Sequence, residues 1–216
     1  MNEMVITREA REARLEGMGC KRKRVEDIRF TQGKGNYVDD VKLPNMVHGD
    51  FVRSPYAHAR ISGVDVSAAL DMPGVVAAYS GADLRDAWGP MPCAWAVTPD
   101  MKAPEHFPIA IDKAAYVGDA VAVVVARSNA EARDAVDMVV VDYDPLPAVI
   151  DLEDALSDRV VIHESLGTNK SYTWELHPQG QEAVDAAFAA AAYTVSERYI
   201  QQRLIPMAME PRAVAA

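Results

Sequence analysis

YVGDAVAVVVARSNAEARDAVDMVVVDY, residues 116–143, is the stretch of this chain that decides its fold. Its continuous apolar run, Ala120–Ala126, predicts a strand covered on both faces, with Val123 almost fully buried. Ser128 and Glu131 then have the capping-box spacing that begins a helix, and a second valine-rich run follows. The order strand, helix, strand predicts a β-α-β unit on a sheet, and therefore an α/β (α+β) fold.

Shorter elements flank this unit. Alternating or apolar residues predict short strands over residues 47–53, 60–66, 75–79 and 148–152. Three other stretches favour helices, residues 67–72, 80–86 and 181–192. Tyr193–Ile200 alternates as a strand with one buried face does, and Ala213–Ala216 begins a further strand without a partner in its own chain.

Two stretches lack regular periodicity. Residues 87–108 contain five prolines, which exclude regular elements, so we expect a long irregular loop. The aromatic side chains of this loop, among them Trp88 and Trp95, indicate packing against another domain or subunit. Residues 153–179 are expected to be a linker between two domains.

The composition excludes several classes of function. Lys and Arg number 22 against 32 Asp and Glu, a net charge of −10, which opposes binding to nucleic-acid phosphates. The longest apolar run, Ala120–Ala126, is far shorter than the roughly 20 residues of a membrane span. Cys20 and Cys93 are too few for an iron–sulfur cluster, which takes about four thiolates. These features predict a cytoplasmic protein with no nucleic-acid partner and no membrane span.

Two short motifs are candidates for binding chemistry. Gly33-Lys-Gly35 has the Gly-x-Gly spacing of phosphate loops, but it lies between no convincing strand and helix. A glycine turn with positive φ is the better interpretation. Asp39-Asp40 is a carboxylate pair, yet adjacent strand residues point to opposite faces, so a turn or cap role is favoured over metal or acid–base chemistry.

The histidines and a basic run complete the candidates. The histidines are scattered without metal-binding spacing, at His48, His58, His106, His163 and His177. His58 is expected to be a positioned structural imidazole. Cys20 lies beside the basic run Lys21–Arg24, which favours a thiolate, but no base can be assigned to it. The basic run is either a solvated turn or a contact for a partner subunit or an anionic cofactor.

Three segments carry a resemblance to a known family. They are residues 33–40 with 53–61 (GKGNYVDD and RSPYAHARI), 116–125 through 141–147 (YVGDAVAVVV and VDYDPLP), and 202–212 (QRLIPMAMEPR). In order and spacing they resemble large, molybdenum-binding subunits of the xanthine dehydrogenase and aldehyde oxidase family. The basic run makes the carbon monoxide dehydrogenase branch the closer match.

The resemblance implies a domain organisation and a set of cofactors. The domains would be an N-terminal extension (1–16), an α/β hammerhead domain (17–152), a linker (153–179) and the start of a molybdenum-binding region (180–216). The parent enzyme would hydroxylate its substrate with oxygen from water at a molybdenum–pterin cofactor. FAD and iron–sulfur clusters would lie in partner subunits or domains.

The resemblance also implies that the catalytic and cofactor-contacting parts lie beyond this chain. No catalytic, cofactor-binding or metal-binding residue is therefore assigned, and Glu210 is expected to be a structural carboxylate. The favoured function is an N-terminal segment of a large subunit, not competent alone, which binds flavin and iron–sulfur subunits or self-associates. The alternatives are a non-catalytic interaction module that uses residues 87–108, and a small free-standing enzyme. Carbon monoxide, aldehydes and N-heterocycles stay open as substrates.

Overall fold

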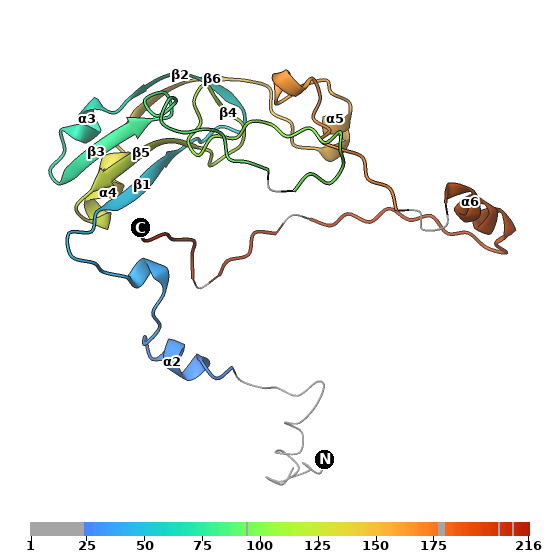
Figure 1. Cartoon of the computed structure of the whole chain (residues 1–216), viewed down its shortest axis with the longest axis horizontal. Coiled ribbons are helices and arrows are strands. Elements are labelled where there is room, and N and C mark those ends of the chain that lie inside the picture. The colour runs from blue at the N-terminus through green and yellow to red at the C-terminus, as the bar shows by residue number, and fades with distance from the viewer. Residues whose placement is uncertain (1–23, 94, 177–179, 203, 209) are drawn as a thin grey trace, which may run out of the picture. The chain divides into compact units, whose positions relative to one another are not determined.

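The computed structural model describes residues 24–93, 95–176, 180–202, 204–208 and 210–216 (Figure 1). Cys20, most of the basic run and His177 lie outside the described residues. The chain divides into two units, which are treated separately below. The first consists of Met1–Leu43 with Ile200–Ala216, and the second is Pro44–Tyr199.

The described part of the first unit contains two short helices, α2 (Asp27–Thr31) and η1 (Val38–Asp40). Gly33 follows α2 with φ +68°, which confirms the predicted glycine turn. The carboxylate of Asp40 accepts a hydrogen bond from the Tyr37 backbone at 3.0 Å, so Asp40 has the cap role predicted for the pair. Glu210 Oε1 accepts from the Val38 backbone at 3.4 Å, which is a contact of a structural kind.

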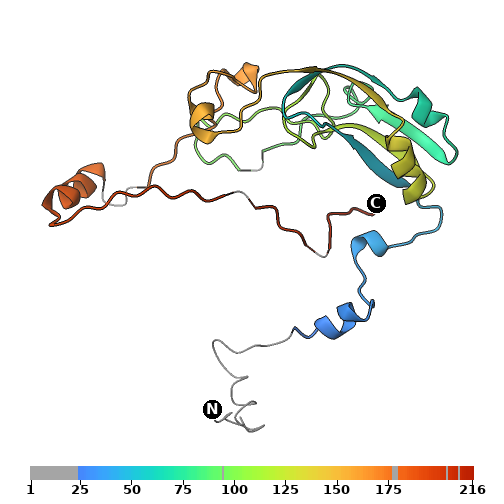
Figure 2. The ribbon, with the colours of Figure 1, turned by 180° about the vertical axis from the view of Figure 1, so that it is seen from behind.

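The second unit contains two three-stranded antiparallel sheets. Sheet A has the order β1 (His48–Arg53), β5 (Ala120–Ala126), β3 (Val75–Ser80). Sheet B has the order β4 (Lys113–Ala114), β2 (Ala59–Asp65), β6 (Val140–Pro145). The helices α3 (Ser67–Leu70) and α4 (Asn129–Val136) lie at one end of this unit, and α5 (Leu152–Leu156) lies at the other (Figures 1 and 2).

The mixed α/β fold class is confirmed, but the predicted β-α-β unit on one sheet is wrong. β5, α4 and β6 follow one another as expected, and the Ser128 side chain caps α4 by accepting from the Glu131 backbone. However, β6 pairs antiparallel with β2 in sheet B, whereas β5 lies at the centre of sheet A. Element order therefore does not fix pairing: β6 takes β2, from an earlier part of the chain, as its partner, with Ala59 opposite Pro145 and Asp65 opposite Val140.

Small side chains fill the core between sheet A and its helices. Val124 on β5 and Ala78 on β3 form a buried cluster with Ala69 of α3 and Ala135 of α4. Met72, Val75, Val136 and other partly buried residues pack against this cluster. Because alanine side chains are short, the helices approach the sheet closely, and little volume change is tolerated there.

The opposite face of sheet A is not covered along its middle by described residues. Val123 faces away from the core because neighbouring strand residues alternate and Val124 faces the helices. Val123 stands opposite Phe51 on β1 and Tyr79 on β3, which are 41% and 43% exposed. Val123 itself is only half-buried, so its predicted near-complete burial is wrong. The apolar run of β5 therefore supplies one face that packs against the helices and a second face that is only half-buried at Val123.

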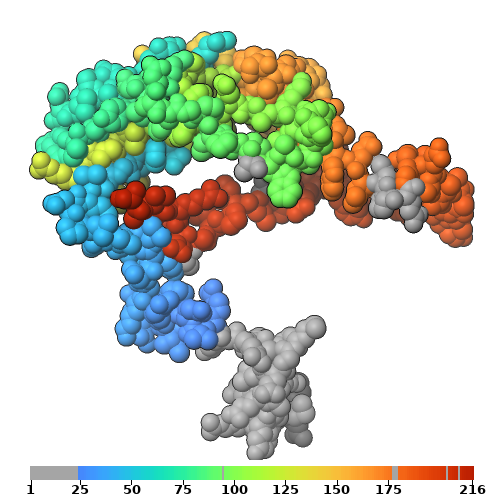
Figure 3. Space-filling view, in the orientation of Figure 1, coloured from blue at the N-terminus to red at the C-terminus, as the bar shows by residue number. Residues whose placement is uncertain are grey.

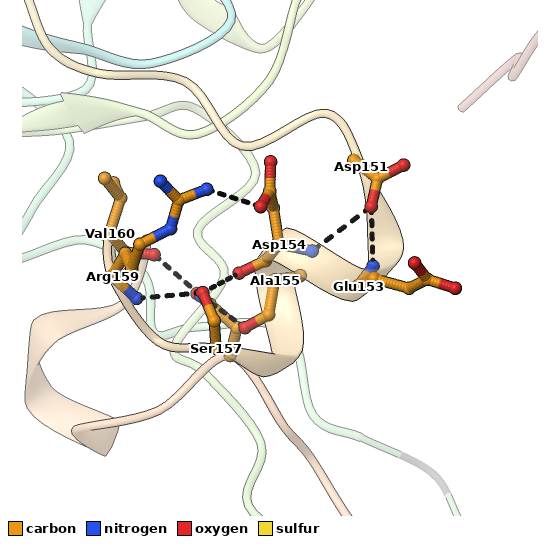
Figure 4. Close-up of polar contacts among 8 residues, drawn as sticks. Asp151, Glu153, Asp154, Ala155, Ser157, Arg159 and Val160 are labelled. Carbon is orange, nitrogen blue, oxygen red and sulfur yellow. Dashed lines mark hydrogen bonds and ion pairs between the residues drawn. The ribbon is translucent and has the colours of Figure 1, made fainter.

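Two local predictions are corrected by polar side chains. Residues 81–86 form turns rather than a helix, since the Asp83 carboxylate holds Ser80 through its backbone (2.8 Å) and hydroxyl (2.7 Å). Residues 148–152 form no strand. Instead Asp151 caps α5 by accepting from the backbones of Glu153 and Asp154, at 2.8 and 3.1 Å (Figure 4).

Beyond α5 lie a 3-10 turn, η2 (Glu164–Leu166), and the helix α6 (Gln181–Ala190), which confirms the helix predicted there. No strand forms over the described residues of 193–200 or 213–216, so the strands predicted there are wrong for this structure. Tyr193 and Val195 are about nine-tenths exposed. A strand requires a hydrogen-bonding neighbour, and the described residues supply none to these segments.

Candidate functional site

A cavity of about 400 Å³ lies in the second unit, between the end of the irregular loop and η2. Charged and imidazole side chains line much of it, among them Arg85, Glu105, His106, Lys113, His163 and Glu164. These residues come from three separate parts of the chain. The cavity is the best candidate for a site among the described residues, because it gathers titratable groups from far apart in the sequence.

Backbone hydrogen bonds fix the cavity wall on both sheets. The Ala110 backbone donates to Ala120 at the start of β5 (2.7 Å), and Ile61 on β2 donates to Asp112 (2.9 Å). Ile109 is 1% exposed and anchors this wall in the interior. The buried carboxylate of Asp119 accepts from the Ala115 backbone at 3.0 Å, which holds the turn after β4.

The two cations of the cavity are both paired. Arg85 binds Asp112 at 2.6 Å in an exposed ion pair. The Lys113 ammonium binds the Glu164 carboxylate and also donates to the backbone carbonyl of Ile162. The Lys113 hydrogen bond lowers the pKa of the Glu164 carboxyl. The Lys113 side chain is only 19% exposed, so this tie is more sheltered than the Arg85 pair.

Three histidines that are scattered in the sequence come together near the cavity. His58 is 4% exposed, and its Nδ1 lies 2.8 Å from the Pro147 carbonyl, as suits the structural role predicted for it. His106 and His163 line the cavity. Burial lowers the pKa of His163, and the positive charge of Lys113 and the neighbouring His106 and His58 lower it further, against an opposing effect of Glu164. His48, on β1, is not part of this group.

The histidine group is accompanied by a tyrosine. The Tyr116 ring lies 6.0 Å from that of His106, and its pKa is raised mainly by burial and then by the Asp119 charge. Sequence reasoning missed this arrangement. No local motif signals it, because the contacts are long-range: Lys113 and Glu164 are 51 positions apart.

The other sequence candidates do not line the cavity. Gly33, Asp39 and Asp40 belong to the first unit. Cys93 is an exposed free thiol whose sulfur lies 3.4 Å from the Trp95 carbonyl. Across the described ranges, no group of three or more His, Cys, Asp or Glu side chains is arranged to hold a metal ion. No helix in the same ranges has the length and apolar character needed to cross a bilayer.

The chemistry available in the cavity is hydrogen bonding and charge pairing. Two imidazoles and two ion pairs face one space, but the cations are already neutralised by carboxylates. No nucleophile is hydrogen-bonded to a base among these residues, so the geometry indicates binding or positioning rather than covalent catalysis.

Comparison with known proteins places this fold in context. Residues 32–147 match the family model described as aldehyde oxidase and xanthine dehydrogenase, a/b hammerhead domain. The carbon monoxide dehydrogenase large chain of Afipia carboxidovorans is 41% identical over 93% of this chain, and that of Hydrogenophaga pseudoflava is 40% identical over 97%. A crystal structure of a Cu,Mo-CO dehydrogenase in the carbon monoxide reduced state superimposes with a TM-score of 0.62. It shares 42% identity, covering 84% of this chain and 23% of the other.

These matches cover very different fractions of this chain and of its relatives. The chain is covered almost completely, but it spans only 25% and 27% of the two curated relatives. What is similar is therefore one segment of a much longer large chain.

Proposed function

Because the chain belongs to the aldehyde oxidase and xanthine dehydrogenase family, we propose that it forms the N-terminal, non-catalytic segment of a carbon monoxide dehydrogenase-like large subunit. The observation that carries this proposal is the 41% identity to such a large chain over 93% of the sequence. The structural match at a TM-score of 0.62 supports the same assignment.

The proposed domain organisation follows the predicted boundaries. The N-terminal extension covers residues 1–16 and the hammerhead domain residues 17–152, and the family match at 32–147 falls inside the latter. Residues 153–179 link this domain to the beginning of a molybdenum-binding region at 180–216. The hydrogen bonds of Asp158 with Thr168 and Asn169 fall within residues 153–179, so we propose an ordered connection there rather than a loose one.

The cavity does not fit the molybdenum–pterin cofactor of the proposed parent enzyme. A pterin phosphate requires unpaired cationic or backbone donors, whereas Arg85 and Lys113 in the cavity are already bound to Asp112 and Glu164. No metal-ligating group is formed across the described ranges. We therefore assign no step of hydroxylation to this chain and place the cofactor on another part of the subunit.

The partners we propose are the flavin and iron–sulfur subunits of a molybdenum hydroxylase, with self-association as a further possibility for the isolated chain. A cytoplasmic location is proposed because two cysteines suit a reducing compartment. Carbon monoxide is the first substrate to test, since the relatives compared above are named for its oxidation. Aldehydes and N-heterocycles complete the substrate panel.

The test is reconstitution from separate polypeptides. This chain is co-expressed with a polypeptide that covers the remaining length of a curated large chain, together with flavin and iron–sulfur subunits. We expect one complex that contains molybdenum and reduces a dye with one substrate of the panel, and no molybdenum in the chain purified alone. An active complex that excludes this chain would overturn the proposal, and molybdenum bound to the chain alone would revive the small-enzyme alternative.

An interaction module built on the hammerhead domain is the second candidate. Trp95 in the irregular loop is 77% exposed and Trp174 is 64% exposed, which is unusual for tryptophan on a free surface. Gel filtration with each candidate subunit tests this function. Binding to a subunit without any molybdenum-containing complex, weakened by Trp95→Ala, would favour the module over the large-subunit segment.

A further inference from the structure

Residues 157–171, which we name the strap, close on themselves. The Asp158 carboxylate accepts from the Thr168 hydroxyl (2.7 Å) and the Asn169 backbone (2.8 Å), which joins the two ends of the strap. The Asn169 side chain accepts from the Ile162 backbone (2.9 Å) and donates to the Val160 carbonyl (2.7 Å), which fills the middle. The strap is therefore a preformed loop rather than a loose connection.

Polar contacts tie the strap to the rest of the second unit. Lys113 on β4 holds the Ile162 carbonyl and the Glu164 carboxylate. Lys102 in the irregular loop donates from its side chain to the Leu166 carbonyl (3.1 Å) and from its backbone to Ser171 (2.9 Å). In the space-filling view the strap lies against the irregular loop (Figure 3).

Apolar burial contributes only part of this attachment. All of residues 151–171 are described, and none is buried. Apolar contacts hold an element to a core through the area that they remove from water. Because Val160, Val161, Ile162 and Leu166 are only partly buried, the strap depends on its hydrogen bonds more than sheet A does. Separation of the strap from the unit would therefore expose partly buried side chains but no fully buried residue of the strap itself.

The strap forms one wall of the cavity. His163, Glu164 and Ser165 line it from the strap side, and Arg85, His106 and Lys113 line it from the other side. Movement of the strap would open the cavity, because Lys113 is the bridge between the two walls.

We propose that the strap is a lid over this cavity, held closed by Lys102 and Lys113 and released by protonation of His163. His163 lines the cavity together with the charged or titratable residues Arg85, Glu105, His106, Asp112, Lys113, Asp119 and Glu164. The charges of Lys113, Glu164, His106 and His58 bear on its protonation. A proton on His163 adds a positive charge near Lys113 and two imidazoles. Two of the cavity's anions are already engaged, Glu164 by Lys113 and Asp112 by Arg85. The added charge therefore repels the residue that closes the lid.

The direction of the pH effect follows from the pKa of His163. Burial and the Lys113 charge lower this pKa in the closed form, whereas the open form has the ordinary value of about 6.5. Above that pH His163 is neutral in both the closed and the open form, so the closing equilibrium of the strap does not depend on pH. Below it the open form takes up the proton more readily, and closure weakens as the pH falls. The pKa of Glu164 is also lowered by Lys113, so its protonation in stronger acid acts in the same direction.

Hydrogen exchange of the full chain, read by mass spectrometry and corrected for intrinsic rates, tests the lid. Between about pH 7.5 and about pH 5.5 we expect exchange of the strap amides to accelerate several-fold, while β5 amides stay protected. Lys113→Met removes both ties and keeps most of the aliphatic stem. It should accelerate strap exchange about ten-fold already at the higher pH.

Two histidine variants separate the switch from a general acid effect. His163→Gln should abolish the acceleration between the two pH values. His48→Gln, on β1 and outside the histidine group, should retain it in full. The inference is overturned if wild-type strap exchange is the same at both pH values, if Lys113→Met leaves the strap protected, or if β5 exchange rises in parallel with the strap.

Discussion

Sheet A and the strap belong to the same unit but are held in opposite ways. Sheet A packs Val124 and Ala78 against helices with complete or nearly complete burial, and few side-chain hydrogen bonds are involved. The strap contains no buried residue and is held by hydrogen bonds centred on Asp158 and Asn169. The second unit therefore combines sheet A, which we expect to unfold only cooperatively, with the strap, which we expect to open locally.

The largest effect is expected in the core of sheet A. Val124→Asp places an unpaired carboxylate in a fully buried position, which should lower the free energy of unfolding by about 4 kcal/mol or more. Val123→Asp is the matched control on the adjacent residue. Because Val123 is half-buried on the open face, we expect a loss of about 1 kcal/mol. Urea unfolding of both variants measures the difference, and equal losses would show that the open face is covered in solution.

A smaller effect is expected where β3 meets the cavity wall. A side chain at Gly81 would place its Cβ 2.2 Å from the Ala110 carbonyl oxygen, so backbone must shift to accommodate it. Gly81→Ala should therefore cost about 1–3 kcal/mol. Gly89→Ala is the control in the irregular loop, since nothing lies within 4 Å of its Cβ. If Gly81→Ala left the free energy of unfolding unchanged, the cavity wall at Ile109 and Ala110 would be displaced as easily as the strap.

Elements governed by local pattern could be predicted from the sequence. The apolar run of β5 and the Ser128 cap of α4 determine their own structure through neighbouring residues. Pairing could not be predicted, because β6 joins β2 through long-range register rather than through its position after α4. The burial of Val123 failed for a related reason: an apolar run does not say which of its faces the rest of the chain covers.

The candidate site was less predictable than the fold. His58, His106 and His163 each stand alone in the sequence, and they come together only in the fold, from the turn before β2, the irregular loop and the strap. Lys113 could not be distinguished from other surface lysines, since its partners Ile162 and Glu164 lie on a segment expected to be a linker. Short polar ties of this kind leave no periodic pattern, unlike a helix face or a strand.

Within the strap, the next test removes its central side chain. Asn169→Ala deletes the hydrogen bonds to Ala155 (3.1 Å), Val160 and Ile162, at a site that is only part-buried. We expect local opening of the strap to become easier by about 1 kcal/mol, with little change in the urea midpoint of sheet A. Ser165→Ala is the control on the same segment, because its hydroxyl forms no hydrogen bond within the described residues. Global destabilisation by Asn169→Ala would contradict the separation of the two regions.

The smallest effect is expected from protonation of Asp158, the residue that joins the two ends of the strap. Hydrogen bonds from Asn169 and Thr168 lower the pKa of the Asp158 carboxyl, so the charged form is favoured in the closed strap. A lowered carboxyl pKa stabilises the structure above the unfolded value of about 3.9, and this contribution disappears as the pH falls through the folded value. Strap exchange in the wild-type chain should therefore rise in two steps, one below about pH 6.5 from His163 and a second below about pH 4 from Asp158 together with Glu164. Asp158→Asn should reduce the second step to the part that comes from Glu164 and keep the first step. His163→Gln should remove the first step and keep the second. If both variants removed the same step, the two groups would titrate as one coupled system, and the His163 lid would not be separable from the closure of the strap.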